Sequence, residues 1–331
     1  MPDPNRSPSR PSTASPLFGT LSVLGAAALF GMLGPLSRAA YDLGMEPAAF
    51  VGWRGLIALL ALGAYVAWRV RRGASRLVRP RDLPVRDRLT LLGAAVMGYT
   101  LNLGMFMAFD RVTVALALLG FYTYPAMIAL ADVALGRERL DRPRAVALLL
   151  ASGGMVAVVA SQLGPAGGIR FDVAGLALAF GAAVSQTVYV VISRHGYRQV
   201  PTEQAVTVVL GVTVVGAGAL AVATGTVASL AAPLRDLELL PILLITGIFA
   251  AAIPSMAFLA GLRIVGGTRA GILMLFEPVV GVALAAWLLA EALVPIQAIG
   301  AVAILAAALI LQRIPPDGRE PPGPPLVPVG P

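Results

Sequence analysis

Ten stretches of about 20 mostly apolar residues run through this chain, and each is long enough to cross a hydrocarbon core of about 30 Å as an α-helix. Strands of a β-barrel would alternate apolar and polar residues, whereas segments such as 145–160 (AVALLLASGGMVAVVA) are apolar on every side. With 58% hydrophobic and 13% charged residues, the chain is too apolar for a water-soluble domain of 331 residues. The pattern predicts an all-α membrane protein with ten transmembrane helices, at residues 17–36, 48–68, 89–108, 113–134, 144–162, 172–193, 204–224, 238–260, 268–290 and 294–312.

The distribution of the 25 basic residues, all of them arginines, favours one orientation in the membrane. If the N-terminus is cytoplasmic, alternate loops and both tails hold 20 arginines, and residues 69–88 alone hold eight. Only four lie in the opposite loops: Arg38, Arg111, Arg170 and Arg235. Because cytoplasmic loops are enriched in arginine and lysine, we expect a multi-pass inner-membrane protein with both termini in the cytoplasm. The net charge of +8 is therefore explained by membrane topology, and no nucleic-acid partner is expected.

The two ends of the chain differ in composition from the apolar stretches. Residues 1–16 are rich in proline and serine, so we interpret them as a disordered cytoplasmic tail. Residues 314–331 form a proline-rich tail that favours extended conformations and would also be cytoplasmic.

The chain repeats itself at a spacing of about 153 residues. Residues 124–138 (YPAMIALADVALGRE) match residues 277–291 (EPVVGVALAAWLLAE), with a proline at the second position and a glutamate at the last. Upstream, residues 25–38 (GAAALFGMLGPLSR) match residues 181–194 (GAAVSQTVYVVISR) at both ends. The agreement of two separate segments indicates an internal duplication.

The duplication divides the chain into a first repeat of five helices at 17–162 and a second at 172–313. Because five is odd, the second repeat must enter the membrane in the opposite orientation, so we expect two inverted repeats. Carriers built in this way have their binding site near the middle of the membrane, where the halves meet. Pro125 and Pro278 fall near the middle of their helices, where a proline removes a backbone hydrogen bond and kinks the helix.

At residues 124–138 and 277–291 the chain resembles the EamA family of the drug/metabolite transporter superfamily, over roughly residues 17–313. Members have two tandem five-helix domains, with a proline near the middle of the fourth helix of each domain and an acidic residue at its end. The resemblance implies export of amino acids, related metabolites or drugs, either driven by an ion gradient or facilitated. Where the family often has a tryptophan in its first helix, this chain has Phe30 and, in the second half, Gln186.

Two ionisable residues are the first candidates for a binding or coupling site, because charges inside a membrane usually face a cavity or a partner. Glu277 lies near the midpoint of the ninth stretch, where it could exchange a proton or bind a substrate amine; the alternative is a carboxyl bonded to a neighbouring helix. Arg54 lies within the second stretch and could pair with a substrate carboxylate or with Glu277. Its alternative is to extend toward the membrane interface.

Several uncharged polar residues are further candidates for the same site. Tyr122 and Tyr124 lie beside Pro125, at the depth that Glu277 has in the other half. The repeat would therefore place the two tyrosines and Glu277 on opposite walls of one cavity. Other polar positions inside predicted helices, which could equally bond helix to helix, are Asn102, Gln186, Tyr99 and Tyr189.

Other titratable residues fit structural roles better. Asp132 could pair with Arg137 or Arg139, and Glu138 and Glu291 would close their helices at opposite membrane faces. His195 is expected to be a solvated histidine at a helix end.

The composition also limits the function. The chain has no cysteine and one histidine, so neither a thiolate nucleophile nor a His or Cys cluster for a metal can form, and we expect no cofactor. The sequence predicts a non-enzymatic secondary transporter that exports a small polar metabolite, such as an amino acid or a drug, by alternating access. The alternatives are a carrier of phosphorylated sugars or nucleotide-sugars, a membrane-embedded enzyme, or a channel. The expected partners are the lipid bilayer and a small-molecule substrate, and a homodimer is possible.

Overall fold

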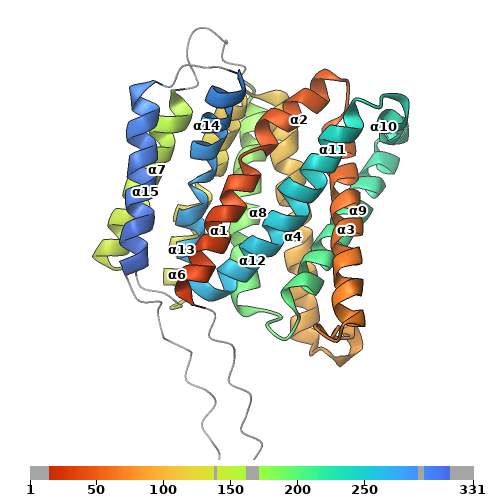
Figure 1. The fold of residues 1–331 in the computed structure, drawn as a ribbon, viewed down its shortest axis with the longest axis horizontal. Coiled ribbons are helices and arrows are strands. Elements are labelled where there is room, and N and C mark those ends of the chain that lie inside the picture. The colour runs from red at the N-terminus through yellow and green to blue at the C-terminus, as the bar shows by residue number, and fades with distance from the viewer. Residues whose placement is uncertain (1–14, 138–139, 162–170, 290–293, 314–331) are drawn as a thin grey trace, which may run out of the picture.

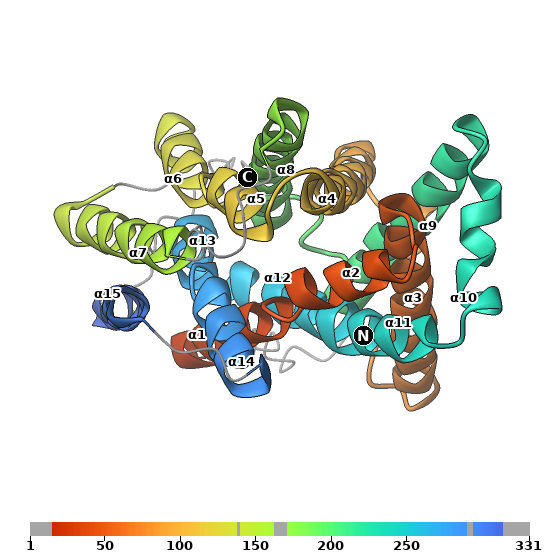
Figure 2. The ribbon, with the colours of Figure 1, turned by 90° about the horizontal axis from the view of Figure 1, so that it is seen from above.

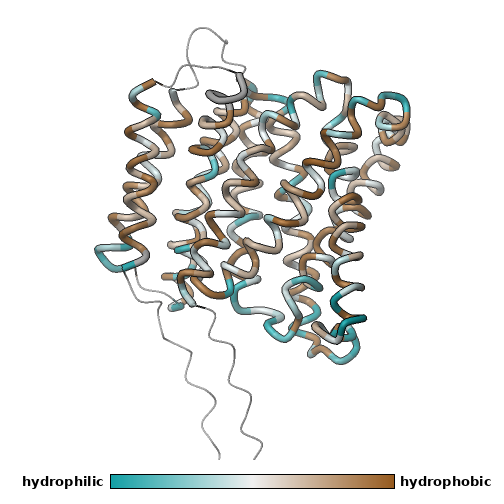
Figure 3. Tube along the Cα trace, viewed as in Figure 1, coloured by the Kyte–Doolittle hydropathy of each residue, from teal (hydrophilic) through white to brown (hydrophobic). Residues whose placement is uncertain are grey.

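The computed structural model describes residues 15–137, 140–161, 171–289 and 294–313, and these residues form helices joined by short connections (Figure 1). Apolar side chains such as Leu60, Leu149 and Val215 are largely exposed on the outside of the bundle. Apolar residues run along the helices, and polar residues gather mainly in the connections at the two ends (Figure 3). An apolar outer surface is what a bilayer requires, and the protein is a multi-pass membrane protein.

The helices of the first half follow the predicted order. They are α1 (Pro16–Phe30), α2 (Leu33–Asp42), α3 (Pro47–Arg71), α4 (Val85–Arg111), α5 (Val114–Phe121), α6 (Tyr124–Ala134) and α7 (Arg142–Ala160). The pairs α1–α2 and α5–α6 each fill one predicted stretch. A short 3₁₀ helix, η1 (Pro80–Asp82), lies in the arginine-rich connection between α3 and α4.

The second half has the same plan. Its helices are α8 (Val173–His195), α9 (Thr202–Ala223), η2 (Val227–Ala231), α10 (Ala232–Arg235), α11 (Leu239–Gly247), η3 (Ile248–Ala252), α12 (Ile253–Val265), α13 (Gly267–Met274), α14 (Glu277–Leu289) and α15 (Pro295–Arg313). The short elements η2 and α10 lie in the connection between the seventh and the eighth predicted stretches.

Eight of the predicted spans are long and apolar enough to cross a membrane within the described residues. Helices α13 and α14 occupy the ninth predicted stretch and α15 the tenth, but within the described ranges neither stretch reaches the same length and apolarity. The count of ten spans therefore remains a prediction. The two tails (residues 1–14 and 314–331), together with Glu138 and Glu291, lie outside the described residues.

Four of the spans are interrupted near the middle of the bundle. The breaks before Pro125 and Pro278 agree with the predicted kinks, since α5 ends at Phe121 and α13 ends at Met274. The first span also breaks, at Gly31–Met32, and the eighth contains the π-helical turn η3 just before Pro254. Neither of these breaks is among the predicted kinks. The extra breaks fit local chemistry, because glycine and proline weaken helical hydrogen bonding and π turns often lie at functional sites.

The main helix contacts have a matching pattern in the two halves. Helix α4 packs along α8, and α1 packs along α12; α3 packs along α9, and α7 along α15. Seen from above, the helices surround a central region to which both halves contribute, with α7 and α15 together at one edge (Figure 2). Helix α1 begins and α15 ends at the same end of the bundle as the connection between α3 and α4 (Figure 1). We call this end the arginine-rich end, and the other the opposite end.

Candidate functional site

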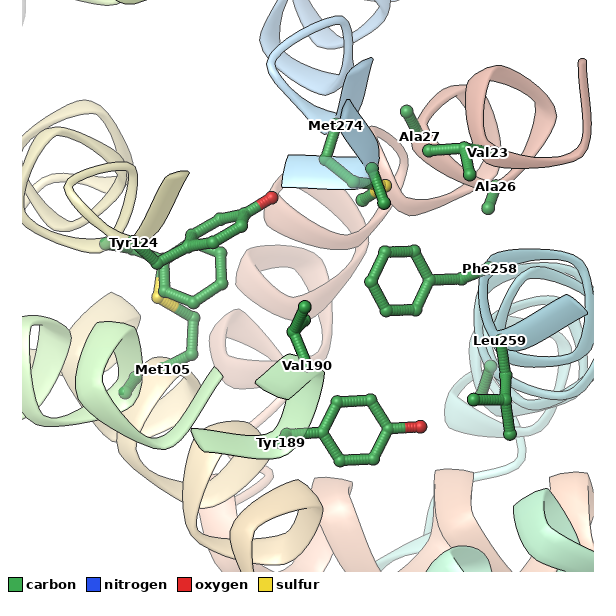
Figure 4. Close-up of a cluster of buried hydrophobic side chains, with 14 of the residues drawn as sticks. Val23, Ala26, Ala27, Met105, Tyr124, Tyr189, Val190, Phe258, Leu259 and Met274 are labelled. Carbon is green, nitrogen blue, oxygen red and sulfur yellow. The ribbon is translucent and has the colours of Figure 1, made fainter. Parts of the chain in front are cut away.

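A cavity of about 130 Å³ lies at the middle of the bundle. It is lined by residues from both halves, drawn from α1 to α6 in the first and from α8, α9, η3 and α12 to α14 in the second. Most of its wall is apolar and aromatic, including Phe106, Phe109 and Phe121. Figure 4 shows Tyr124, Tyr189, Phe258 and Met274 converging there from different helices. Such a wall with a few polar groups is typical of a small-molecule site.

Residues at equivalent places in the two halves line this cavity in pairs. At the spacing of 153 residues that separates Pro125 from Pro278, the pairs are Gly98 and Ala251, Asn102 and Ser255, Met105 and Phe258, Phe121 and Met274, and Tyr124 and Glu277. At the spacing of 156 that relates residues 25–38 to 181–194, the pairs are Phe30 and Gln186, and Leu33 and Tyr189. The duplicated sequence thus contributes matching positions to one cavity.

Glu277 is the first residue of α14 and follows the break at Leu275–Phe276. Its carboxyl interacts electrostatically with the hydroxyls of Tyr122 and Tyr124. Both hydroxyls are buried; that of Tyr122 is placed to donate to the Glu277 carboxyl, whereas that of Tyr124 has no hydrogen-bond partner among the described residues. No described basic side chain lies within 4.0 Å of Glu277. Within the described part of the chain the carboxyl therefore lacks an ion-pair partner and stands beside two tyrosine hydroxyls, so it can accept a cation or a proton.

Arg54 is only 5% exposed, so its side chain does not extend toward the membrane interface. Its Nη2 atom donates to the Asn102 side chain, and its Nη1 atom donates to the Ala250 carbonyl at 3.1 Å. The guanidinium also lies over the Phe106 ring, 4.8 Å from its centre. The Ala250 carbonyl would accept from residue 254 in a regular helix, but Pro254 has no N–H to donate.

The charge on Arg54 is not balanced by an acid in direct contact. No carboxylate among the described residues lies within 4.0 Å of it, and its Nε atom has no hydrogen-bond partner among them. A buried cation held only by neutral groups is expensive, so an anion entering the cavity would be stabilised there. Arg54 and Glu277 line the same cavity but do not form an ion pair.

Two amide side chains add polar atoms to the wall. Asn102 donates to the Gly98 carbonyl at 2.7 Å, which orients its oxygen toward Arg54. Gln186 is buried, and its Oε1 atom has no hydrogen-bond partner among the described residues. That oxygen can accept a hydrogen bond from a molecule in the cavity.

Five of the six predicted site residues thus line one cavity: Arg54, Asn102, Tyr124, Gln186 and Glu277. Tyr122 does not line it, although its hydroxyl is close to Glu277. Tyr189, a secondary candidate, belongs to the lining, whereas the Tyr99 ring packs near Gly216 of α9.

The remaining titratable candidates are elsewhere. Asp132 is buried where α6 meets α13, with a carboxylate oxygen close to Gly267, and His195 ends α8 at the arginine-rich end. Sequence reasoning missed Ser255 and Phe258, which could have been found by applying the 153-residue spacing to Asn102 and Met105. Within the described residues no group of three His, Asp or Glu side chains is placed to hold a metal ion.

Comparisons with known proteins agree with this architecture. The model of the EamA-like transporter family matches the chain twice, at residues 17–160 and 173–313. A solved structure, described only as the crystal structure of a protein, is similar over 88% of this chain and 94% of its own, with a TM-score of 0.68 and 22% sequence identity. That likeness supports the fold alone. No curated protein matches the sequence. Because the two matched segments cover most of its length, the chain belongs to the EamA-like transporter family.

Proposed function

We propose that this protein is a secondary transporter that exports a small polar metabolite by alternating access, and that the central cavity is its substrate site. The observation that carries the proposal is the pair Arg54 and Glu277. These opposite charges come from different halves of the protein, line one cavity and have no ion-pair partner among the described residues. Keeping charges unpaired inside a membrane is costly, so their retention favours a role in binding or coupling.

The substrate class that suits this pair carries both a carboxylate and an amine, as amino acids do. The carboxylate would bind Arg54, whose fork of donors is pre-oriented by Asn102 and the Ala250 carbonyl. The amine would bind Glu277, close to the free hydroxyl of Tyr124. In the absence of an amine, Glu277 could hold a proton instead, which would couple export to a proton gradient.

The rest of the wall favours an apolar or aromatic body between the two charged groups. Phe30, Phe106, Phe258 and Met274 all line the cavity. Such side chains can bury the body of a branched or aromatic amino acid, or of a hydrophobic amine drug.

A carrier of phosphorylated sugars or nucleotide-sugars fits less well. Among the described residues that line the cavity, Arg54 is the single cationic side chain. A phosphate with two charges would be expected to bind several basic groups, whereas one guanidinium matches one carboxylate.

We further propose that the two repeats are inverted and that the arginine-rich end faces the cytoplasm of a cell whose inner membrane holds the protein. The start of α1 and the end of α15 both lie at this end, which supports cytoplasmic termini (Figure 1). The matched contacts of α1 with α12 and of α8 with α4 support a twofold relation between the halves. Export would then proceed from the arginine-rich end to the opposite end.

The test is uptake of labelled compounds into liposomes that contain the purified protein, with and without a pH gradient. The panel pairs apolar amino acids with two kinds of analogue: N-acetyl derivatives, which lack the amine charge, and amides, which lack the carboxylate charge. Cationic drugs and sugar phosphates complete it. We expect saturable uptake of at least one apolar amino acid, and weaker uptake of both of its analogues.

The controls are empty liposomes and a melting curve that shows the reconstituted protein is folded. Saturable uptake of sugar phosphates without uptake of amino acids would contradict the proposed substrate class. A folded protein that carries no member of the panel would contradict the proposed function as stated here.

A further inference from the structure

The two ends of the bundle differ in how tightly the kinked helices close over the central cavity. At the arginine-rich end, α13 packs directly on α6. A Cβ atom added to Gly271 would lie 3.3 Å from Ile128 Cδ1 and 3.5 Å from Pro125 Cβ, and one added to Gly267 would lie 2.7 Å from an oxygen of Asp132. The glycines of α13 therefore allow α6 and α13 to touch, which closes the space between these two helices.

At the opposite end, a second pocket of about 510 Å³ is lined by the corresponding helices, α5 and α14, together with residues of α2, α4, α7 and α15. Val114 and Leu118 of α5 form part of one side, and Glu277, Pro278 and Gly281 of α14 form part of the other. Glu277, Phe109 and Leu118 line both this pocket and the central cavity. The second pocket thus begins where the central cavity ends, and Glu277 lies on the boundary between them.

The repeat shows that the α6–α13 contact and the second pocket are built from equivalent positions. At the 153-residue spacing, Val114 corresponds to Gly267 and Leu118 to Gly271. On the partner helix, Pro278 corresponds to Pro125 and Gly281 to Ile128. Four positions of the α6–α13 contact, Pro125, Ile128, Gly267 and Gly271, thus have their equivalents around the second pocket.

Large and small side chains are exchanged between the two ends. At the arginine-rich end the large residue, Ile128, is on α6 and the glycines are on α13. At the opposite end the large residues are on α5, and the glycine, Gly281, is on α14. The neighbouring helices also differ in side-chain size between the two ends. Gly31 and Gly34 line the second pocket, and their equivalents at the 156-residue spacing are the larger Thr187 and Val190.

This exchange makes the shapes of α5 and α14 complementary. If α5 moved toward α14, Leu118 could lie against Gly281 much as Ile128 lies against Gly271. Close helix contact in membranes depends on small residues of this kind. The contact would fill the second pocket and separate Glu277 from the opposite end.

We propose that the second pocket is the half of the transport path that leads from Glu277 to the opposite end, and that it closes when Val114 and Leu118 of α5 pack against Pro278 and Gly281 of α14. In this account the structure represents the state open to the opposite end. The other state would have α5 on α14 and would separate α6 from α13. The inference rests on the proposed function, because only alternating access requires the two contacts to exclude each other.

The protein contains no cysteine, so pairs of cysteines can report each contact without background. Pro125→Cys with Gly271→Cys reports the closed contact, because the native Cβ atom of Pro125 lies 3.5 Å from the Cβ position at Gly271, within disulfide range. Leu118→Cys with Pro278→Cys is the equivalent pair at the opposite end. A variant with all four cysteines is oxidised in liposomes, and the remaining thiols are counted by maleimide labelling and intact mass. Each disulfide is then located by digestion.

We expect every four-cysteine molecule to form one of the two disulfides and to keep two free thiols. Molecules with both disulfides in substantial yield, or a pair at the opposite end that never forms, would overturn the proposal. Because the prolines could be needed for folding, Ile128→Cys with Gly271→Cys and Gly281→Cys with Leu118→Cys, joined by a short bifunctional thiol reagent, provide a second set with the same expectation. Melting curves identify the set that folds.

The crosslinking experiment needs no transport assay. A result that contradicts the proposed closure of α5 on α14 can therefore be distinguished from a result that contradicts the proposed function. If the disulfides exclude each other but no compound is carried, the gate stands and the substrate proposal fails. If amino acids are carried while both disulfides form in one molecule, transport stands and this gate is wrong.

Discussion

The two halves of the protein give the central cavity the same scaffold but different chemistry. At one pair of equivalent positions, the first half supplies Tyr124 and the second supplies Glu277. Helix α3 contributes Arg54, whereas no charged residue of α9 lines the cavity. The duplication explains where the side chains lie, and the differences between the halves explain what they could bind. Substitutions at positions where the two halves differ in chemistry should therefore change transport. Substitutions at positions that only pack helix against helix should change stability.

The largest effect is expected for Glu277→Gln, which leaves both halves with an uncharged residue at this position. Removing one member of the buried charge pair that Glu277 would form with a substrate amine costs about 3–5 kcal/mol, which is a loss of roughly 150- to 4,000-fold in affinity. Uptake of an amine-bearing substrate into liposomes should fall accordingly. Tyr124→Phe is the matched change in the other half; it removes one hydroxyl beside Glu277 and no charge, so its loss should be much smaller. Unchanged uptake by Glu277→Gln would assign Glu277 a structural role.

Arg54→Met should produce the next largest loss, about 100-fold, because it removes the donors for a carboxylate while keeping a long side chain. The loss should be restricted to substrates with a carboxylate, as measured by competition with amides of the same compounds. Arg54→Lys keeps the charge but not the forked donors, so it should recover only part of the activity. An equal loss for amides and acids would contradict carboxylate binding.

Gln186→Phe makes the second half resemble the first at the position of Phe30 and removes the unpaired acceptor. Loss of one hydrogen bond to a substrate costs about 1–3 kcal/mol, so we expect roughly tenfold weaker uptake. The exchange in the other half, Phe30→Gln, serves as its counterpart. If Gln186→Phe left the concentration for half-maximal uptake unchanged, Gln186 would not contact the substrate.

Substitutions in the contact between α7 and α15 should change the stability of the protein and leave its substrate preference unchanged. A Cβ atom added to Gly154 would lie 2.6 Å from the Gly300 carbonyl, so Gly154→Val must push the helices apart. Overpacking of this kind costs about 1–3 kcal/mol and should lower the melting temperature by a few degrees. Gly153→Ala is the control, because nothing lies within 4 Å of its added Cβ atom. Equal melting temperatures for the two variants would refute the close crossing.

The smallest effect is expected at the first helix of each half, whose N-caps differ in charge. Ser15 caps α1, whereas Asp172 caps α8 and pairs with Arg111 at 3.2 Å. The backbone N–H of Ala174 and the Arg111 guanidinium hold the pKa of Asp172 below its usual value of 3.8. Its stabilisation is therefore present above pH 3.8 and is lost as the pH falls through the lower, folded-state pKa.

Asp172→Ser, which copies the cap of the first half, should lower the melting temperature slightly at pH 7. The difference from the natural protein should shrink as the pH falls below 3.8, because the carboxylate becomes protonated. A difference that is constant over this range would show that the charge contributes nothing.

Much of the fold could be predicted because lipid permits few solutions. Apolar runs of membrane length can only be helices, and the duplicated segments relate the halves before any contact is known. The breaks at Pro125 and Pro278 could be predicted because proline has no backbone N–H and therefore removes one hydrogen bond of the helix. The break at Gly31–Met32 and the π-helical turn before Pro254 could not be predicted in the same way, because similar residues elsewhere continue a helix.

The site could be predicted only in part. Buried charges such as Arg54 and Glu277 are informative because they are costly, and they do line one cavity. Tyr122 was expected in the same wall as Tyr124, but the helix break between them turns only Tyr124 toward the cavity. Gly281 lines the second pocket at the position that Ile128 occupies in the first half, and this difference could be interpreted only after the helices had been placed.

The most direct test of the account is an experimental structure of the protein with a transported amino acid bound. The account predicts that the ligand lies in the central cavity, with its carboxylate within hydrogen-bonding distance of Arg54 and its amine within reach of Glu277. A ligand bound outside this cavity, or one that contacts neither charge, would contradict the central claim that the two halves share one substrate through these residues.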